Sequence, residues 1–165
     1  MLDTDVDNSF IQLGGIGTNN RLDDYEEGTF DPTFTAGLGS GTLSVDFYNL
    51  QSGNYVKVGK KVTCIIGLAT NQSTVSGTAA LQISGLPFTV ESTDINILGG
   101  NLSDGAEIDN IANVTAVDRG NDNTSIIFRY NSGAAENDSF ITLNISDLQG
   151  FGEYIKVLIT YFTTQ

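Results

Sequence analysis

The sequence has no histidine, no tryptophan and a single cysteine among its 165 residues. Without histidine, neither a Ser-His-Asp or Cys-His catalytic arrangement nor a histidine-ligated metal site is possible. One cysteine excludes an intramolecular disulfide, a four-cysteine zinc site and an iron–sulfur cluster. We therefore expect a non-enzymatic protein that uses no metal and no cofactor.

Positive charge is also scarce. Seven Lys and Arg residues stand against 20 Asp and Glu residues, which gives a net charge of −13. Nucleic-acid binders gain much of their affinity by neutralising phosphates, so this balance argues against such a partner. No apolar run approaches the roughly 20 residues of a membrane-spanning helix. We expect neither a nucleic-acid partner nor membrane insertion.

The composition and the order of apolar and polar residues indicate strands joined by turns. Charged residues make up only 16% of the chain, whereas glycine (19 residues), Ser, Thr and Asn are abundant. Apolar residues alternate in short runs bounded by Gly, Asn, Asp and Ser, which is typical of strands. The predicted strands cover residues 29–35, 54–58, 61–69, 79–84, 94–98, 111–117, 125–130, 140–145 and 154–162. Turns are predicted at 38–41, 51–54, 121–123 and 132–133, and one helical turn at 146–148.

This succession of short strands predicts an all-β fold, an antiparallel β-sandwich with jelly-roll topology as one good option. The first 22 residues differ from the rest, because alternating aspartates are followed by a glycine-rich stretch. We expect residues 1–22 to form an extended N-terminal arm with a short β piece. Residues 23–165 are then the sandwich domain.

Several predicted strands are apolar on both faces, at Ile65, Ile127, Leu158 and Phe162 among other positions. A sandwich buries only one face of each sheet, so the second apolar face needs another cover. Scattered exposed hydrophobic residues are one interpretation. The favoured interpretation is a subunit interface through these four residues.

Candidate ligand sites are weakly marked. The aspartates between residues 3 and 7 have the spacing that opens a calcium loop, but the glycine and glutamate required later in that loop are missing. The polar residues of 118–123 suit either a cation site or a hairpin loop. The acidic group at 23–27 offers carboxylates for glycoside hydrolysis, although a solvated or partner-binding charge cluster is the simpler interpretation. Cys64 lies among the apolar residues on one face of the predicted strand at 61–69, so we expect its thiol to be buried.

Four blocks are more distinctive: RLDDYEEGTFDPT at 21–33, GNYVKVGKKV at 53–62, ISGLPFT at 83–89 and TLNISDL at 142–148. Together, and in this order, they resemble the C-terminal receptor-binding (tip) domain of bacteriophage tail fibre and tailspike proteins. The resemblance runs from about residue 21 to residue 165. Residues 90–140 match no part of that pattern.

The resemblance implies a homotrimer at the distal end of a viral fibre, displayed on the virion surface and adhering to host surface glycans. Residues 1–22 would attach the domain to an upstream fibre, tail or capsid component. The loops at 101–110, 119–124 and 131–138 are the expected glycan-binding regions. The candidate glycan-binding residues are Asn121, Asp122, Tyr130, Asn131, Asn137 and Asp138.

Three alternatives stay open at this point. A purely structural trimeric fibre or capsid-decorating protein would form trimers without binding host cells. A glycan depolymerase would release sugar and would depend on carboxylates such as Glu26. A cellular carbohydrate-binding module would be a monomer.

Overall fold

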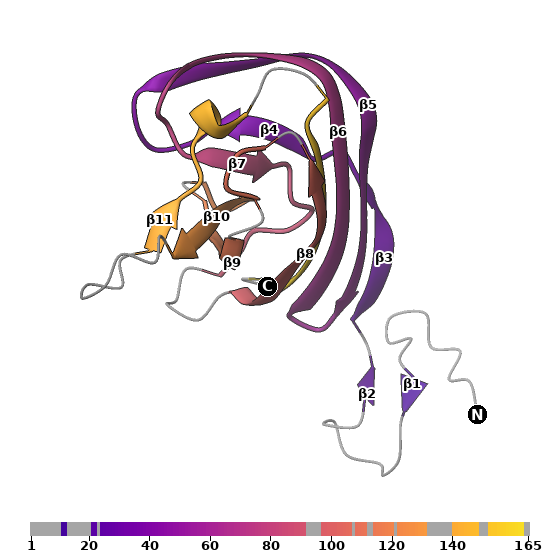
Figure 1. Cartoon of the computed structure of the whole chain (residues 1–165). Helices are drawn as coiled ribbons and strands as arrows, with labels where there is room; N and C mark the ends of the chain where they lie inside the picture. Colours follow the sequence, from indigo (N-terminus) through magenta and orange to yellow (C-terminus); the bar gives the residue numbers. More distant parts are fainter. Residues whose placement is uncertain are drawn as a thin grey trace.

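Figure 1 shows a computed structural model of the chain, which describes residues 11–12, 21–22, 24–91, 97–106, 108–111, 114–120, 122–131, 140–148 and 152–163. All strand pairings in these ranges are antiparallel, so the predicted all-β fold is confirmed. The elements are β1 (Ile11–Gln12), β2 (Arg21–Leu22), β3 (Tyr25–Phe30), β4 (Thr33–Ala36), β5 (Gly41–Val58), β6 (Lys61–Gly77), β7 (Leu81–Ser84), β8 (Ile97–Ala106), β9 (Val114–Arg119), β10 (Ser125–Asn131), β11 (Phe140–Thr142), the 3₁₀ turn η3 (Ile145–Asp147) and β12 (Tyr154–Phe162).

Two five-stranded sheets make up the body of the protein. Sheet I has the strand order β3-β5-β6-β12-β8, and sheet II has the order β11-β10-β7-β4 with β9 also pairing with β10. The short strands β1 and β2 pair with each other, with Ile11 opposite Leu22. That pairing agrees with the short β piece expected within the first 22 residues.

The hydrophobic core receives alternate residues from both sheets. In β12 and β6 the buried positions follow the predicted period of two, because successive side chains of a strand point to opposite faces. One buried cluster includes Val62, Cys64, Ile66, Leu68, Ile155, Val157, Ile159 and Tyr161 from sheet I, and Leu81, Ile83, Ile126 and Phe128 from sheet II. Because both sheets contribute to one cluster, the arrangement is consistent with a β-sandwich.

The predicted strand at 29–35 is two strands. β3 ends at Phe30 and belongs to sheet I, whereas β4 begins at Thr33 and belongs to sheet II. Pro32 lies in the break, where its missing N–H ends the ladder. The Pro32 carbonyl accepts a hydrogen bond of 3.0 Å from Nε2 of Gln51. The break therefore carries the chain from one sheet to the other.

The predicted turn at 51–54 is wrong, because these residues lie inside β5. Each of them pairs with β6, from Gln51 opposite Leu68 to Asn54 opposite Ile65. The aromatic ring of Phe30 packs over Gly53, where an added Cβ would lie 2.5 Å from the ring. Gly53 is thus required for close packing rather than for chain reversal, and the ladder overrides the local turn preference.

β5 and β6 are much longer than predicted and form one hairpin of 18 and 17 residues. Figure 1 shows the pair curving from sheet I over the top of the molecule. The register shifts between Val45 and Leu50, and such bulges bend a strand and increase its twist. The hairpin therefore bends over one end of the core instead of stopping near residue 69.

Two of the predicted connections are confirmed. Residues 38–40 form a bend, in which Gly39 has a φ of 121° that favours glycine. The helical turn predicted at 146–148 is η3, which begins one residue earlier. The carboxylate of Asp147 accepts a hydrogen bond of 2.7 Å from the backbone N–H of Asn144 and so fixes the start of this turn.

Candidate functional site

Three of the four distinctive sequence blocks meet in space. The strand from the first block, β3, pairs with the end of β5 from the second, from Tyr25 opposite Val58 to Phe30 opposite Gly53. Phe88, from the third block, meets the ring of Tyr55 edge-on at 5.2 Å between ring centroids. The three blocks therefore form one structural unit along the β3 edge of sheet I.

Two glycine–aromatic pairs make this unit possible. Phe30 is paired with Gly53, and Tyr55 is paired with Gly28 on the same side of the sheet. A Cβ added to Gly28 would lie 2.9 Å from the Tyr55 ring. Each ring thus occupies the space that a larger residue on the neighbouring strand would fill. This close packing explains why a glycine stands opposite each of the two aromatic residues in the paired strands.

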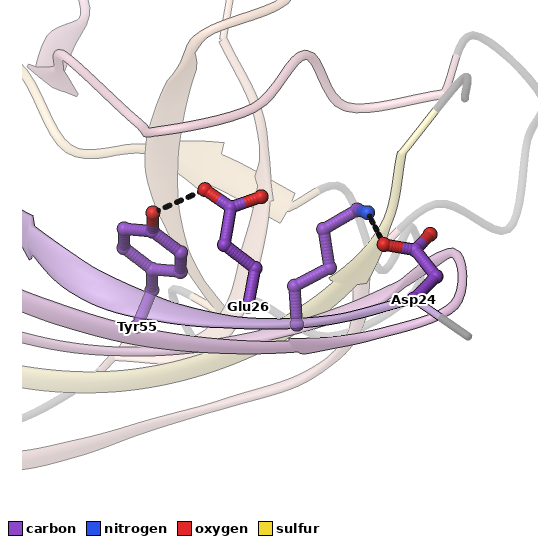
Figure 2. A network of polar contacts seen from close by, with 4 residues as sticks. Asp24, Glu26 and Tyr55 are labelled. Carbon is purple, nitrogen blue, oxygen red and sulfur yellow. Dashed lines mark hydrogen bonds and ion pairs between the residues drawn. The ribbon is translucent and has the colours of Figure 1, made fainter. Parts of the chain in front are cut away.

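A polar network covers the same unit (Figure 2). The ammonium group of Lys57 lies 2.5 Å from Oδ1 of Asp24, and Tyr55 donates a hydrogen bond of 2.6 Å to Oε1 of Glu26. The Lys57 side chain is only 1% exposed, and its ammonium group also lies 5.5 Å from the centroid of the Phe88 ring. A buried ammonium group needs such compensation, because the isolated charge would be strongly disfavoured there.

Two tyrosine phenols in this region each donate a hydrogen bond to a carboxylate. The hydrogen bond to Glu26, followed by a smaller effect of desolvation, raises the pKa of the Tyr55 phenol above its ordinary value. Glu27 points to the opposite face of β3 and accepts a hydrogen bond of 2.7 Å from the hydroxyl of Tyr25. Strand alternation therefore separates Glu26 from Glu27, and each carboxylate has a phenol partner.

The other face of sheet I carries exposed apolar side chains among polar ones. We call it the outer face, defined by the outward residues of β3, β12 and the adjoining halves of β5 and β6. Ile65 and Leu158 are directly paired at its centre and are 59% and 43% exposed. Phe162 lies on the same face and is partly exposed. Three of the four residues predicted for a subunit interface thus share one surface.

Ile127 does not belong to this surface. It lies in β10 of sheet II, opposite Gln82, and is only 9% exposed. The chain itself covers Ile127, so this residue needs no second subunit to bury it. The expectation that Ile127 needs cover from a second subunit is therefore wrong.

The candidate glycan-binding residues that the structure describes lie toward the two ends of β10, Asp122 before its start and Tyr130 and Asn131 at its end. Asp122 holds its own turn, accepting hydrogen bonds from the backbone N–H and the hydroxyl of Thr124 at 2.9 and 3.1 Å. Tyr130 is partly buried and packs against the core, and Asn131 is the last residue of β10. Asn121, Asn137 and Asp138 lie outside the described residues, so the 131–138 loop is placed only at its first residue.

One of the predicted glycan-binding loops is mostly strand. Residues 101–106 form the second half of β8 and pair with β12, from Asn101 opposite Leu158 to Ala106 opposite Tyr154. The loop prediction was wrong because Gly, Asn, Ser and Asp in this segment have low strand propensity. Pairing with the strongly apolar β12 overrides that preference.

Neither a metal centre nor a membrane span appears in the part of the chain that the structure describes. No group of three or more His, Cys, Asp or Glu side chains there is placed to hold a metal ion. No helix within the same residues has the length and apolar character to cross a membrane. Comparison with protein-family models, with curated proteins and with solved structures finds no match for this chain.

Proposed function

We propose that this chain is the tip of a bacteriophage fibre or spike, a homotrimer with jelly-roll-like subunits that binds host surface glycans during adsorption. In this proposal the protein is displayed on the virion surface and has no enzymatic activity. Residues 1–22 attach the tip to an upstream fibre, tail or capsid component.

The observation that carries this proposal is the convergence of the tip-like sequence blocks. Residues 21–33, 53–62 and 83–89 are far apart in the chain but build one unit of paired strands, glycine–aromatic contacts and an ion pair between the buried Lys57 and the half-exposed Asp24. The fourth block joins sheet II, where Leu143 donates its backbone N–H to Phe128 and accepts from Leu81. Blocks that depend on one another in space support a shared framework rather than a chance likeness.

Receptor binding is assigned to the segments that lie outside this framework. The 122–124 turn connects β9 to β10, and both the turn and the end of β10 lie within residues 90–140. Loops held by a rigid sheet are common recognition sites. A weak glycan site repeated in three subunits gains avidity, because binding at one site raises the effective concentration at the others. The family likeness, rather than the fold alone, motivates this step.

A purely structural fibre or capsid-decorating protein is the second candidate. It is favoured by the engagement of loop side chains within the chain itself. Asp122 accepts hydrogen bonds from Thr124, and Asn123 accepts one from the guanidinium group of Arg119. Side chains already committed to a turn or to one another are less available to a ligand.

A polysaccharide-binding experiment distinguishes the two candidates. The purified chain is applied to an array of bacterial lipopolysaccharides and capsular polysaccharides. We expect binding to a subset of them, reduced at least tenfold by Asp122→Ala combined with Asn137→Ala and Asp138→Ala. Thr42→Ala, an exposed change in β5 outside these loops, serves as the control and retains binding. No binding to any polysaccharide, or equal binding by the loop variant, would overturn the receptor role.

A further inference from the structure

One side-chain carboxamide is buried on the face of sheet II that points away from the core. Leu81 and Ile83 of β7 enter the core cluster, so strand alternation turns Gln82 to the opposite face, yet Gln82 is only 2% exposed. Its Nε2 donates a hydrogen bond of 2.8 Å to Oγ of Ser125, which is fully buried. Its Oε1 has no hydrogen-bond partner in the described part of the chain. An unsatisfied buried carbonyl is unfavourable, and the bond to Ser125 is what this carboxamide provides in return.

Two glycines close over the carboxamide of Gln82. A Cβ added to Gly120 would lie 2.7 Å from Nε2 of Gln82, and a Cβ added to Gly37 would overlap the same carboxamide. Neither glycine has a positive φ, so the close approach, rather than the backbone conformation, requires glycine at both positions. The carboxamide is therefore enclosed by the connections that follow β4 and β9.

Ser125 joins this buried carboxamide to the 122–124 turn. A hydroxyl group can accept and donate at the same time. Oγ of Ser125 accepts from Gln82 and donates a hydrogen bond of 3.3 Å to the backbone carbonyl of Asp122. The Asp122 carboxylate in turn accepts from the backbone N–H of Thr124 at 2.9 Å. One chain of hydrogen bonds thus runs from the interior of sheet II to the tip of the turn.

The turn is also bonded to the framework through its backbone. Leu86, in the third distinctive block, donates its N–H to the carbonyl of Thr124 at 3.0 Å, and Val90 donates to the carbonyl of Asn123 at 2.6 Å. These bonds hold the turn in one conformation. In the described part of the chain, the side-chain hydrogen bonds that Asp122 accepts all go to Oδ1, which leaves Oδ2 for a ligand.

We infer that Gln82 and Ser125 are positioning residues for receptor binding, which fix the 122–124 turn without touching the ligand themselves. The inference rests on the proposed glycan-binding role. A turn that is already held in its binding conformation loses less conformational entropy on binding. A turn that adopts this conformation only part of the time binds more weakly by the same fraction. The ligand group is a saccharide hydroxyl that donates to Oδ2 of Asp122.

Ser125→Ala and Gln82→Met test this role by calorimetric titration with the polysaccharide that the unmodified chain binds on the array. We expect each variant to bind it about tenfold more weakly. Because Gln82 acts through Ser125, the double variant should bind no more weakly than Ser125→Ala. Amide hydrogen exchange at Leu86 should be at least tenfold faster in both variants, whereas exchange at Val157 in β12 stays unchanged.

Thr35→Val is the matched control. It removes the 2.6 Å hydrogen bond between the hydroxyls of Thr35 and Ser84, which lies on the same face of sheet II and does not reach the turn. This variant should bind like the unmodified chain. Unchanged exchange at Leu86 in Ser125→Ala, or equal loss of binding in Thr35→Val, overturns the inference.

The titration also separates failure of this inference from failure of the proposed function. If the unmodified chain binds the polysaccharide and Ser125→Ala binds it equally well, the positioning role is overturned and the receptor role stands. If the unmodified chain binds no polysaccharide, the receptor role is overturned and the positioning role falls with it.

Discussion

Lys57 shows that a correctly predicted strand does not reveal which of its two faces is buried. The alternation of β5 puts Lys57 on the same face as Gly53 and Tyr55, whereas Val56 and Val58 point outward. Composition would have suggested the reverse, with the valines inward. The lysine is accommodated because Asp24 and the Phe88 ring lie beside its ammonium group. A single sequence does not indicate these partners, because they come from distant segments.

Removing the carboxylate of Asp24 should lower the free energy of unfolding more than replacing Lys57 by an uncharged residue. Asp24→Asn leaves the ammonium group of Lys57 buried without a countercharge, and we expect a loss of about 3 kcal/mol in the free energy of unfolding. Lys57→Met keeps the length of the side chain without its charge and should cost less than about 1 kcal/mol. Urea unfolding of the two variants and of the double variant checks this order. A larger loss for Lys57→Met than for Asp24→Asn would contradict it.

Two buried acids should make the fold sensitive to alkali. Burial raises the pKa of the Cys64 thiol to about 12, and burial followed by the nearby thiol raises the pKa of Tyr161 above its ordinary value. The folded chain therefore holds these protons more tightly than the unfolded chain, whose thiol ionises near 9.0. The stabilisation is complete below pH 9 and is lost as pH rises, by about 1 kcal/mol per pH unit.

Urea unfolding between pH 7 and pH 11 tests this dependence. Cys64→Ala lowers stability at every pH by leaving a cavity, but it should flatten the decline between pH 9 and pH 10. The decline above pH 10 should persist in this variant, because Tyr161 is unchanged. A free energy of unfolding that stays constant from pH 8 to pH 11 would refute the assignment.

At the scale of elements, strands with strong alternation were predictable and glycine-containing strands were not. β12 was predicted with its correct bounds, and the first half of β6 with its correct buried face, because apolar residues alternate over the whole run. The segments 51–54 and 101–106 were interpreted as turn or loop from Gly, Ser and Asn. Both are held in sheet I by pairing with neighbouring strands, which local propensity does not report.

Gly53 should resist a substitution that strand propensity alone would favour. Gly53→Ala places a methyl group against the Phe30 ring, and we expect a loss of about 2 kcal/mol in the free energy of unfolding. Asn54→Ala, at the next position on the exposed face, should change stability by less than about 0.5 kcal/mol. Phe30→Leu should restore part of the loss in the Gly53→Ala background. Thermal unfolding of Gly53→Ala, Asn54→Ala, Phe30→Leu and the Gly53→Ala/Phe30→Leu double variant measures these effects, and a neutral Gly53→Ala would contradict the packing argument.

At the scale of the whole molecule, the sequence allowed part of the candidate interface to be predicted. Ile65 and Leu158 were recognised as belonging to two-faced apolar strands, and both lie exposed at the centre of one sheet face. Ile127 has the same local pattern but is covered by the chain. The pattern of apolar residues along a strand indicates that both of its faces are apolar. It does not indicate which face the rest of the fold covers. The candidate glycan-binding residues depend on loop geometry, for which the sequence holds no comparable periodic signal.

An oligomer that buries the outer face should melt at a temperature that depends on protein concentration. Association favours the folded form by mass action, so the melting temperature should rise by about 5 °C between 1 and 100 µM chain. Ile65→Glu should melt at the same temperature at both concentrations. Differential scanning calorimetry of both proteins provides the measurement. A wild-type melting temperature that is independent of concentration would indicate that the folded chain does not associate in this range.

The position of β12 sets the order in which the protein is completed during synthesis. β12 is the last described strand in the chain, yet it lies inside sheet I between β6 and β8. Until the ribosome has released residues 154–162, β8 has no partner in that sheet and the whole β6 edge is open. Open strand edges promote aggregation of nascent chains. Premature stop codons before residue 154 should therefore yield insoluble fragments rather than a smaller folded domain, and folding must wait for translation of this strand.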